Sequence, residues 1–359
     1  MKEKLVLFLV FFLLVMCIPM MAMGFSLPQA PAPGEETSQA GSEGPSQASG
    51  EESQPQSQPE PAQQAQGEIT AQVPTEKTFK ILNENTGKVE EVSIRDYVRG
   101  AVCAEMPPDF ALEALKAQAV AAHTYALRLQ QEQKSSPNEK LKGADFSARP
   151  QDWLVYTTEE LARERFGDKF EQYWQKICQA ADEVVDEILL YEEQPIVAAY
   201  HSMSAGKTED AKNVWEAGAP YLVPAESFGD TLAPDYETTV KLTSDEVKAL
   251  LQAQGEITLP EDPAGWFSAE ERSDSGYLTQ IQAGDKTFTG NELRNILSLR
   301  SSNVQVGYQD NAFTFTVKGY GHGVGLSQYG ADYMARQGDG YRDILAHYYP
   351  GTTLAKAVY

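Results

Sequence analysis

The stretch VCAEMPPDFALEALKAQAVAAHTYAL, residues 102–127, decides the fold of this chain. Its apolar residues, among them Leu112, Leu115 and Ala119, recur at helical spacing, so the second half of the stretch predicts an amphipathic helix. Asp109 is the expected N-cap of that helix. The many alanines indicate that other elements approach the helix closely, which predicts a buried central scaffold.

Glu105 stands just before this helix. Pro107 and Pro108 cannot lie in a helix interior, so Glu105 is expected in a loop or at a strand end. A carboxyl group held at the mouth of a buried helix is a candidate general acid. The alternative is a loop carboxylate that caps the helix or meets solvent, and this stretch alone does not decide between the two.

The first quarter of the chain does not have the composition of a globular domain. Residues 1–25 begin with Lys2 and Lys4 and continue as an almost unbroken apolar run. This pattern predicts an uncleaved membrane anchor, with the rest of the chain outside the cytoplasm, and a cleaved signal peptide is the alternative. Residues 26–77 are mostly Pro, Gln, Ser, Glu, Gly and Ala, which predicts a disordered tether because such a segment cannot bury enough apolar surface to fold.

Residues 78–359 predict an α+β domain, because helices and strands do not alternate regularly. A hairpin is expected at its start, followed by a helix from Ile94 to about Gly100. Residues 130–150 are expected to be loops, and residues 188–191 and 196–202 two strands of a second hairpin. Residues 221–303 are expected to form a smaller inserted α+β region.

The net charge of −23 argues against binding to nucleic acid or direct attraction to anionic membrane surfaces. Of three cysteines, Cys17 lies in the apolar N-terminal run, while Cys103 and Cys178 either form a disulfide or remain buried thiols. A His-Glu-x-x-His motif, a Cys-x-x-Cys pair and a close His/Cys cluster are all missing, so no metal site is expected.

The chain has four histidines, and two of them lie in small-residue loops at predicted strand ends. His201 is in AYHSMSAGKTE and His322 is in GYGHGVG. A single histidine is most often structural, but loops on a rigid scaffold carry binding and catalysis. These two histidines are therefore candidates for a functional site.

Three separated segments together resemble one family, the stage II sporulation protein D family of lytic transglycosylases. The segments are AVCAEMPPDFALEALKAQAVAAHTYAL from Ala101, AYHSMSAGKTEDAKNVW from Ala199, and GYGHGVGLSQYGADYMARQ from Gly319 with the later YRDILAHYYPGT. They occur in the expected order, and LRSS at residues 299–302 also fits. The resemblance runs from about residue 78 to the C-terminus, and the anchor and tether match the family's usual layout.

The resemblance implies cleavage of peptidoglycan glycan strands between N-acetylmuramic acid and N-acetylglucosamine. It implies a 1,6-anhydro product, a preference for peptide-stripped strands and no cofactor. The family's catalytic glutamate falls on Glu105, whose pKa an apolar wall would have to raise for the group to be protonated at rest. Polar residues of the matching segments are expected to hold the sugar, namely Gln118, His123, Tyr200, His201, Ser202, Ser204, His322 and Gln328.

Two departures from the family pattern matter. Members usually carry Arg where His123 stands, which puts one cationic contact with substrate in doubt. Some members also hold zinc through a Cys/His cluster after this helix, whereas GADFSARPQDWLVY at residues 143–156 has neither residue type, so no zinc is expected.

The setting implied by the resemblance is engulfment in a spore-forming bacterium. The chain would sit in the engulfing membrane of the mother cell, with a cell-wall amidase or endopeptidase and other membrane proteins as partners. Because the same domain occurs in proteins that bind the wall and stimulate amidases, a non-enzymatic peptidoglycan-binding module is the alternative function. A zinc amidase would need ligands that the sequence lacks.

Overall fold

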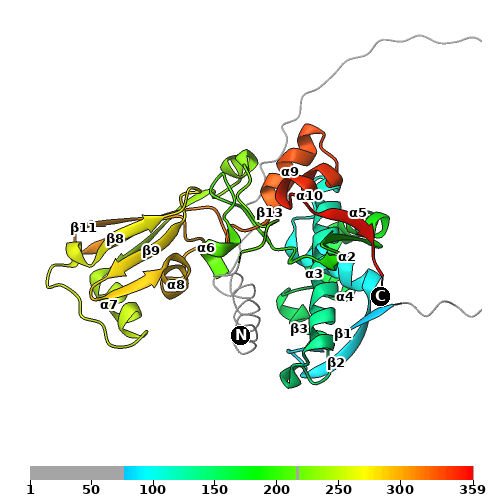
Figure 1. The fold of residues 1–359 in the computed structure, drawn as a ribbon, viewed down its shortest axis with the longest axis horizontal. Helices are drawn as coiled ribbons and strands as arrows, with labels where there is room; N and C mark the ends of the chain where they lie inside the picture. The colour runs from blue at the N-terminus through cyan, green and yellow to red at the C-terminus, as the bar shows by residue number, and fades with distance from the viewer. Residues whose placement is uncertain (1–76, 216–217, 359) are drawn as a thin grey trace, which may run out of the picture. The chain divides into compact units, whose positions relative to one another are not determined.

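The computed structural model describes residues 77–215 and 218–358, which Figure 1 shows in colour. The expected anchor at residues 1–25 and nearly all of the predicted tether lie outside these ranges. Within the described ranges, no helix is both long enough and apolar enough to span a membrane.

Helix α3 (Leu112–Ser135) is the scaffold of the first hydrophobic core. Its alanines at positions 114, 117, 119 and 121 are fully buried, and such small side chains allow neighbours to approach closely. Packed against it are α2 (Ile94–Glu105), α5 (Phe170–Val184), α9 (Gln328–Gln337), α10 (Tyr341–Tyr348) and β4 (Glu187–Tyr191) (Figure 1). The buried central helix predicted from the alanines is confirmed.

The boundaries on either side of Glu105 differ from the sequence-based expectation. Helix α2 continues past Gly100, so Glu105 is its last residue rather than part of a loop or strand. Met106 then adopts an extended conformation (φ −119°, ψ 143°), and the two prolines that follow prevent further helix. The N-cap of α3 is Ala111 instead of Asp109. Its N–H donates to Oδ1 of Asp332 in α9 at 2.6 Å, so a distant carboxylate takes the capping role.

The chain begins with the expected hairpin, in which β1 (Thr78–Asn83) pairs antiparallel with β2 (Lys88–Ser93). A third strand, β3 (Phe146–Ala148), pairs parallel with β1, although residues 130–150 were expected to be loops. Its three residues are too few to show a pattern in the sequence, and the pairing is long-range. Helix α4 (Glu159–Phe166) follows, capped by the Thr158 side chain.

The second predicted hairpin is only partly present. Strand β4 pairs with the short β5 (Gln194–Pro195) and, on its other side, with β14 (Thr353–Lys356). The chain then leaves this sheet, and only β6 (Tyr200–His201) is extended enough to pair again. Its partner is β13 (Leu326–Ser327), with Leu326 opposite Tyr200 and Ser327 opposite His201 in a parallel register. This pairing brings two distant sequence motifs side by side.

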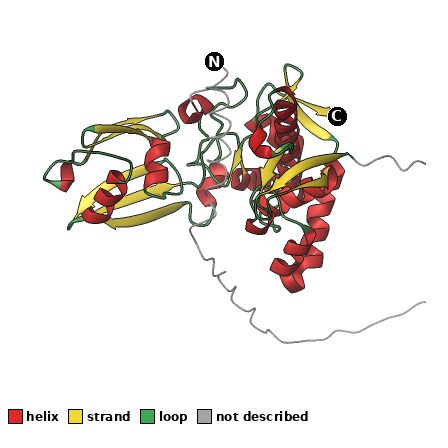
Figure 2. Ribbon diagram, turned by 90° about the horizontal axis from the view of Figure 1, so that it is seen from below, coloured by secondary structure: helices red, strands yellow, loops and turns green. Residues whose placement is uncertain are grey.

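A second hydrophobic core has buried members from Val247 to Val317, including Phe313 and Phe315. Figure 2 shows its strands in yellow beside short red helices. One of its sheets has the order β11 (Val304–Gln309), β12 (Ala312–Lys318) and β7 (Glu237–Thr243), and the other has the order β10 (Lys286–Thr289), β9 (Leu278–Ala283) and β8 (Phe267–Arg272). Together with the first core, these elements confirm the mixed α+β class. The remaining α-helices of the described residues are α6 (Ala211–Trp215), α7 (Ser244–Gln252) and α8 (Gly290–Ile296).

Candidate active site

Glu105 lies at the C-terminal end of α2, with its side chain partly exposed. Burial raises the pKa of its carboxyl from 4.5 to about 7, and a hydrogen bond from Gln328 opposes part of that rise. The negative end of the α2 dipole also disfavours a carboxylate at this position. At neutral pH the group therefore exchanges readily between its protonated and ionised forms.

Gln328, the first residue of α9, contacts Glu105 through its side-chain amide. The same amide nitrogen donates to Oε1 of Gln118 in α3 at 3.3 Å. Because the Gln328 NH₂ has two protons, it can serve both acceptors at once. Gln118 is fully buried and Gln328 nearly so, which holds this pair in place beside the Glu105 carboxyl.

Two buried tyrosines complete the surroundings of Glu105. Tyr97 comes from α2, about two turns before Glu105, and Tyr200 comes from β6. Burial raises the pKa of both phenols, and the nearby Glu105 charge raises them further. Both phenols are thus neutral hydroxyl groups at physiological pH. The sequence interpretation named Tyr200 but missed Tyr97, which only the full length of α2 would have indicated.

His201 and His322 form a neutral pair next to Tyr200, with ring centroids 5.6 Å apart. Nδ1 of His201 donates to the Val324 carbonyl oxygen at 3.1 Å, whereas Nδ1 of His322 accepts from the Val324 N–H at 3.0 Å. Burial lowers the pKa of His201 to about 4 and that of His322 well below its ordinary value. The two rings hold opposite tautomers, because one bonds to the carbonyl oxygen and the other to the N–H of the same residue, Val324, and neither supplies a cation at neutral pH.

Ser202 and Ser204 lie on the loop after β6 and differ in their exposure and hydrogen bonding. The backbone carbonyl of Ser202 accepts from the N–H of Tyr329 at 3.0 Å, and its side chain is partly exposed. Ser204 is fully buried, and its hydroxyl donates to Asp230 at 2.5 Å. The Ser204 hydroxyl is therefore already committed to Asp230, a residue that the sequence interpretation did not single out.

His123 is not brought to Glu105. It is fully buried in α3, with its ring 6.4 Å from that of Phe79 and a hydrogen bond to the Glu187 backbone. Burial lowers its pKa to about 4, so the imidazole is neutral. A direct contact between His123 and a substrate would require the core to open, so its predicted role in substrate binding gains no support from its position.

The cysteines Cys103 and Cys178 are both unpaired thiols, in the packed helices α2 and α5. Burial raises the pKa of the Cys103 thiol to about 12, which makes it a poor nucleophile. Within residues 77–215 and 218–358, no group of three or more His, Cys, Asp or Glu side chains is arranged to hold a metal ion.

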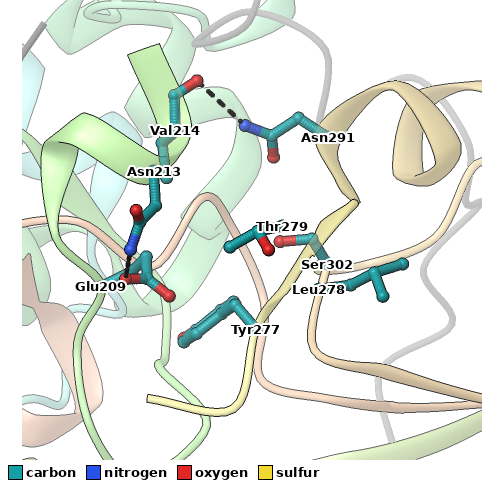
Figure 3. Close-up of a pocket in the computed structure, with 8 residues that line it drawn as sticks. All are labelled: Glu209, Asn213, Val214, Tyr277, Leu278, Thr279, Asn291 and Ser302. Atoms are coloured by element: carbon teal, nitrogen blue, oxygen red, sulfur yellow. Dashed lines mark hydrogen bonds between the residues drawn. The ribbon is translucent and has the colours of Figure 1, made fainter. Parts of the chain in front are cut away.

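Figure 3 shows a small polar pocket whose lining does not include Glu105. In it the Asn213 amide donates to Glu209 at 2.9 Å and the Asn291 amide donates to the Val214 carbonyl at 3.4 Å. Two of its lining residues are apolar: Val214 packs against the first hydrophobic core, and Leu278 belongs to the second. The lining residues are Glu209, Asn213, Val214, Tyr277, Leu278, Thr279, Asn291 and Ser302.

Comparison with known proteins identifies the family of this chain. The family model for stage II sporulation protein matches residues 82–191, which include Glu105 and α3. The amidase enhancer of Bacillus subtilis (strain 168) is 27% identical over 317 residues, covering 72% of this chain and 40% of that protein.

Two relatives match more closely and over more of their own length. The stage II sporulation protein D of Bacillus amyloliquefaciens is 35% identical over 269 residues, covering 75% of this chain and 76% of the relative. The protein of the same name from Bacillus subtilis (strain 168) gives the same identity and coverage. From these matches, and from the shared segment around Glu105, the chain belongs to the stage II sporulation protein D family.

Proposed function

We propose that this protein is a lytic transglycosylase that cleaves the bond between N-acetylmuramic acid and N-acetylglucosamine in peptidoglycan glycan strands. The observation that carries the proposal is the Glu105 carboxyl, which is partly exposed at a helix end and has a pKa raised to about 7. A general acid works best when its pKa lies near the working pH, because it must both hold and release its proton.

In the proposed reaction, protonated Glu105 donates its proton to the glycosidic oxygen as the bond from C1 of the muramic residue breaks. The resulting carboxylate then accepts the proton of that residue's own C6 hydroxyl, whose oxygen attacks C1. The products are a 1,6-anhydro-muramic end and a strand with a new free hydroxyl, and Glu105 returns to its protonated form. No water is consumed.

A single carboxyl suits this chemistry. Hydrolytic glycosidases use two carboxyl groups, because one must act on water or as the nucleophile. Among the described residues, the influences on the Glu105 pKa are burial and Gln328, and no second carboxylate is one of them. An internal hydroxyl nucleophile removes the need for that second group.

The neighbours of Glu105 suit a group that alternates between two charge states. The Gln328 amide stabilises the carboxylate after proton transfer, since hydrogen bonds to a charged acceptor are the stronger ones. The Tyr200 phenol is neutral and can donate or accept a hydrogen bond at a sugar hydroxyl. His201 follows Tyr200 in β6, and both His201 and His322 bond to Val324, which ties this strand to the glycine loop.

The wider setting is also part of the proposal. We infer that residues 1–25 anchor the protein in the engulfing membrane of a sporulating cell, with the catalytic domain outside the cytoplasm. Its substrate would be glycan strands already stripped of stem peptides by an amidase or endopeptidase. The basic start and long apolar run of the N-terminus support the anchor, and family membership supports the link with sporulation.

The test is product analysis with the purified protein and peptide-free glycan strands. The wild type is expected to release anhydro-muramic ends, and Glu105→Gln to reduce their formation at least 1000-fold (~4 kcal/mol of lost transition-state stabilisation) with glycan binding unchanged. Glu91→Gln, which alters an exposed glutamate on β2, is the matched control and should retain activity. An active Glu105→Gln protein would remove Glu105 from the acid role.

A second candidate is a non-enzymatic module that binds peptidoglycan and stimulates an amidase. The similarity to an amidase enhancer favours it. The two candidates separate in one experiment, because stimulation of an amidase should survive Glu105→Gln whereas transglycosylase activity should not. Glycan binding and amidase stimulation by a wild-type protein that releases no anhydro product would establish this second candidate instead of the first.

A further inference from the structure

We propose that Asp230 is a positioning residue for the Glu105 site, because it holds the loop after β6 against the start of α9 and thereby fixes Gln328 beside the Glu105 carboxyl. This inference rests on the proposed function of Glu105. Asp230 lies in a 3-10 turn, Phe228–Leu232, whose sequence has no motif pointing to the site.

Asp230 is a fully buried carboxylate that gathers four neutral donors. Its Oδ2 atom accepts from the Ser204 N–H at 2.7 Å and from the Ser204 hydroxyl at 2.5 Å. Its Oδ1 atom accepts from the Ser327 hydroxyl at 2.6 Å, and the Ser227 hydroxyl also donates to the carboxylate. Among the described residues, no lysine, arginine or histidine lies within ion-pairing distance of it.

A buried carboxylate without a cation is costly to maintain, so its retention needs a compensating arrangement. The four donors provide part of that compensation. The start of α9 adds to it, because Ser327 is its N-cap and a helix N-terminus stabilises nearby negative charge. Burial still raises the pKa of Asp230 above its ordinary value. The titratable groups that face Asp230 are the phenols of Tyr236, Tyr277 and Tyr348, which are uncharged at neutral pH.

The link from Asp230 to Glu105 is short. Ser327 is held by Asp230, and the next residue is Gln328, which donates to Glu105 and to Gln118. Asp230 also holds Ser204, which lies three residues after His201. His201 is the β6 residue that pairs with Ser327. Gly330 allows the close approach, because a Cβ there would meet the Tyr348 hydroxyl at 2.1 Å and the Ser227 hydroxyl at 2.2 Å.

The test is a ¹³C NMR titration of the Glu105 carboxyl in the whole chain, assigned by its loss in Glu105→Gln. Asp230→Asn presents an NH₂ group where the carboxylate has an acceptor, so at least one serine is released and Gln328 should withdraw from Glu105. The Glu105 midpoint is expected to rise by about one pH unit, the effect of losing one hydrogen bond to a charged group. Simple removal of the Asp230 negative charge would lower the midpoint, so the sign separates positioning from direct electrostatics.

Gln328→Leu gives the shift of the Glu105 midpoint when its hydrogen bond from Gln328 is lost completely. The double variant with Asp230→Asn should show no further shift of that midpoint. Glu209→Gln is the matched control, because Glu209 is an equally buried carboxylate with its own donors but no link to α9. It should leave the Glu105 midpoint in place. An unchanged or lowered midpoint in Asp230→Asn, or additive shifts in the double variant, would overturn the proposal.

Ser327→Ala is the alternative if Asp230→Asn does not fold, since it removes the hydrogen bond from Ser327 to Asp230 and keeps the Asp230 carboxylate. It should raise the midpoint in the same direction by a smaller amount, and an unshifted midpoint would again refute the role of Asp230. The titration needs no turnover. A wild type without transglycosylase activity but with these shifts would refute the proposed function and leave the positioning role intact.

Discussion

At the scale of single residues, Glu105 combines a chemical role with a cost in stability. Its folded pKa of about 7 lies above the ordinary value of 4.5 because burial disfavours the charged form. The folded protein therefore binds more protons than the unfolded chain between these two pH values. By linkage, stability falls as pH rises through this window, and above pH 7 the ionised, partly buried Glu105 carboxylate lowers the stability of the folded protein.

Glu105→Gln should consequently stabilise the protein at high pH while it removes the proposed activity. We expect the free energy of unfolding at pH 8 to increase by about 1–3 kcal/mol over the wild type, with little difference at pH 4, where Glu105 is protonated in the folded protein and mostly protonated in the unfolded chain. Urea denaturation at the two pH values measures the effect.

The control for this prediction is Glu91→Gln, which changes an exposed glutamate and should shift stability equally at both pH values. If Glu105→Gln gave the same change at pH 4 and pH 8, the Glu105 carboxyl would not be desolvated in the folded protein. Such a result would also weaken the general-acid role, since a carboxyl with an ordinary pKa is ionised at neutral pH.

At the scale of elements, the start of α3 depends on α9. Asp332 Oδ1 accepts from the Ala111 N–H at 2.6 Å, while its Oδ2 pairs with Arg336 at 2.7 Å. The first turn of a helix has backbone N–H groups without intrahelical partners, so a carboxylate there supplies both a hydrogen bond and favourable charge. The cap joins the helix that carries Gln118 to the helix that carries Gln328.

Asp332→Ala should therefore destabilise the protein by about 1–2 kcal/mol in denaturant unfolding at pH 7, as expected for the loss of an N-cap. Asp332→Asn keeps an acceptor for the Ala111 N–H and should cost less. Asp245→Ala, which removes an exposed aspartate from the first turn of α7, is the matched control and should cost only a few tenths of a kcal/mol. Equal losses in Asp332→Ala and Asp245→Ala would mean that the tertiary cap contributes nothing.

The elements that the sequence predicts are those whose caps and turns lie within their own stretch of sequence. Helix α7 is recognisable because its capping box, Thr243 with Glu246, lies within the helix's own sequence. The β1–β2 hairpin is recognisable for the same reason, since its turn and both strands are contiguous. The start of α3 is not, because the residue that caps it lies in α9. Strands β3 and β6 are too short to show alternation and exist only through long-range pairing.

The site residues show the same difference between signals within one stretch of sequence and long-range contacts. Glu105, Tyr200, Gln118 and Gln328 could be proposed from sequence because they lie in long segments that resemble one family, and the structure brings them together. Which of these residues contact one another could not be predicted, since Gln328 and Gln118 are separated by 210 residues in the sequence. Asp230 had no signal in the sequence, because its donors Ser204 and Ser327, which connect it to the site, lie 26 and 97 residues away.

At the scale of the whole described chain, two apolar cores meet through polar contacts. The Ser275 hydroxyl donates to the Thr208 carbonyl at 2.7 Å, and the Tyr277 hydroxyl accepts from the Ala205 N–H at 3.0 Å. Tyr277 is buried, and a Cβ on Gly323 would come within 2.7 Å of its ring. Tyr277, which directly precedes the second-core residue Leu278, thus supports the loops that carry Ser204 and His322.

Tyr277→Phe isolates this support, because it removes the hydroxyl and keeps the ring that packs on Gly323. The Ala205 N–H then loses its acceptor, at a cost of about 1 kcal/mol. We expect amide hydrogen exchange to accelerate by about fivefold to tenfold across residues 203–208, with protection in the interior of α3 unchanged. Tyr308→Phe alters a β11 tyrosine that lies away from these contacts and should change neither region. Faster exchange throughout α3 in Tyr277→Phe would show that the two cores open as one unit, and an unchanged loop would show that the Tyr277 hydroxyl does not hold it.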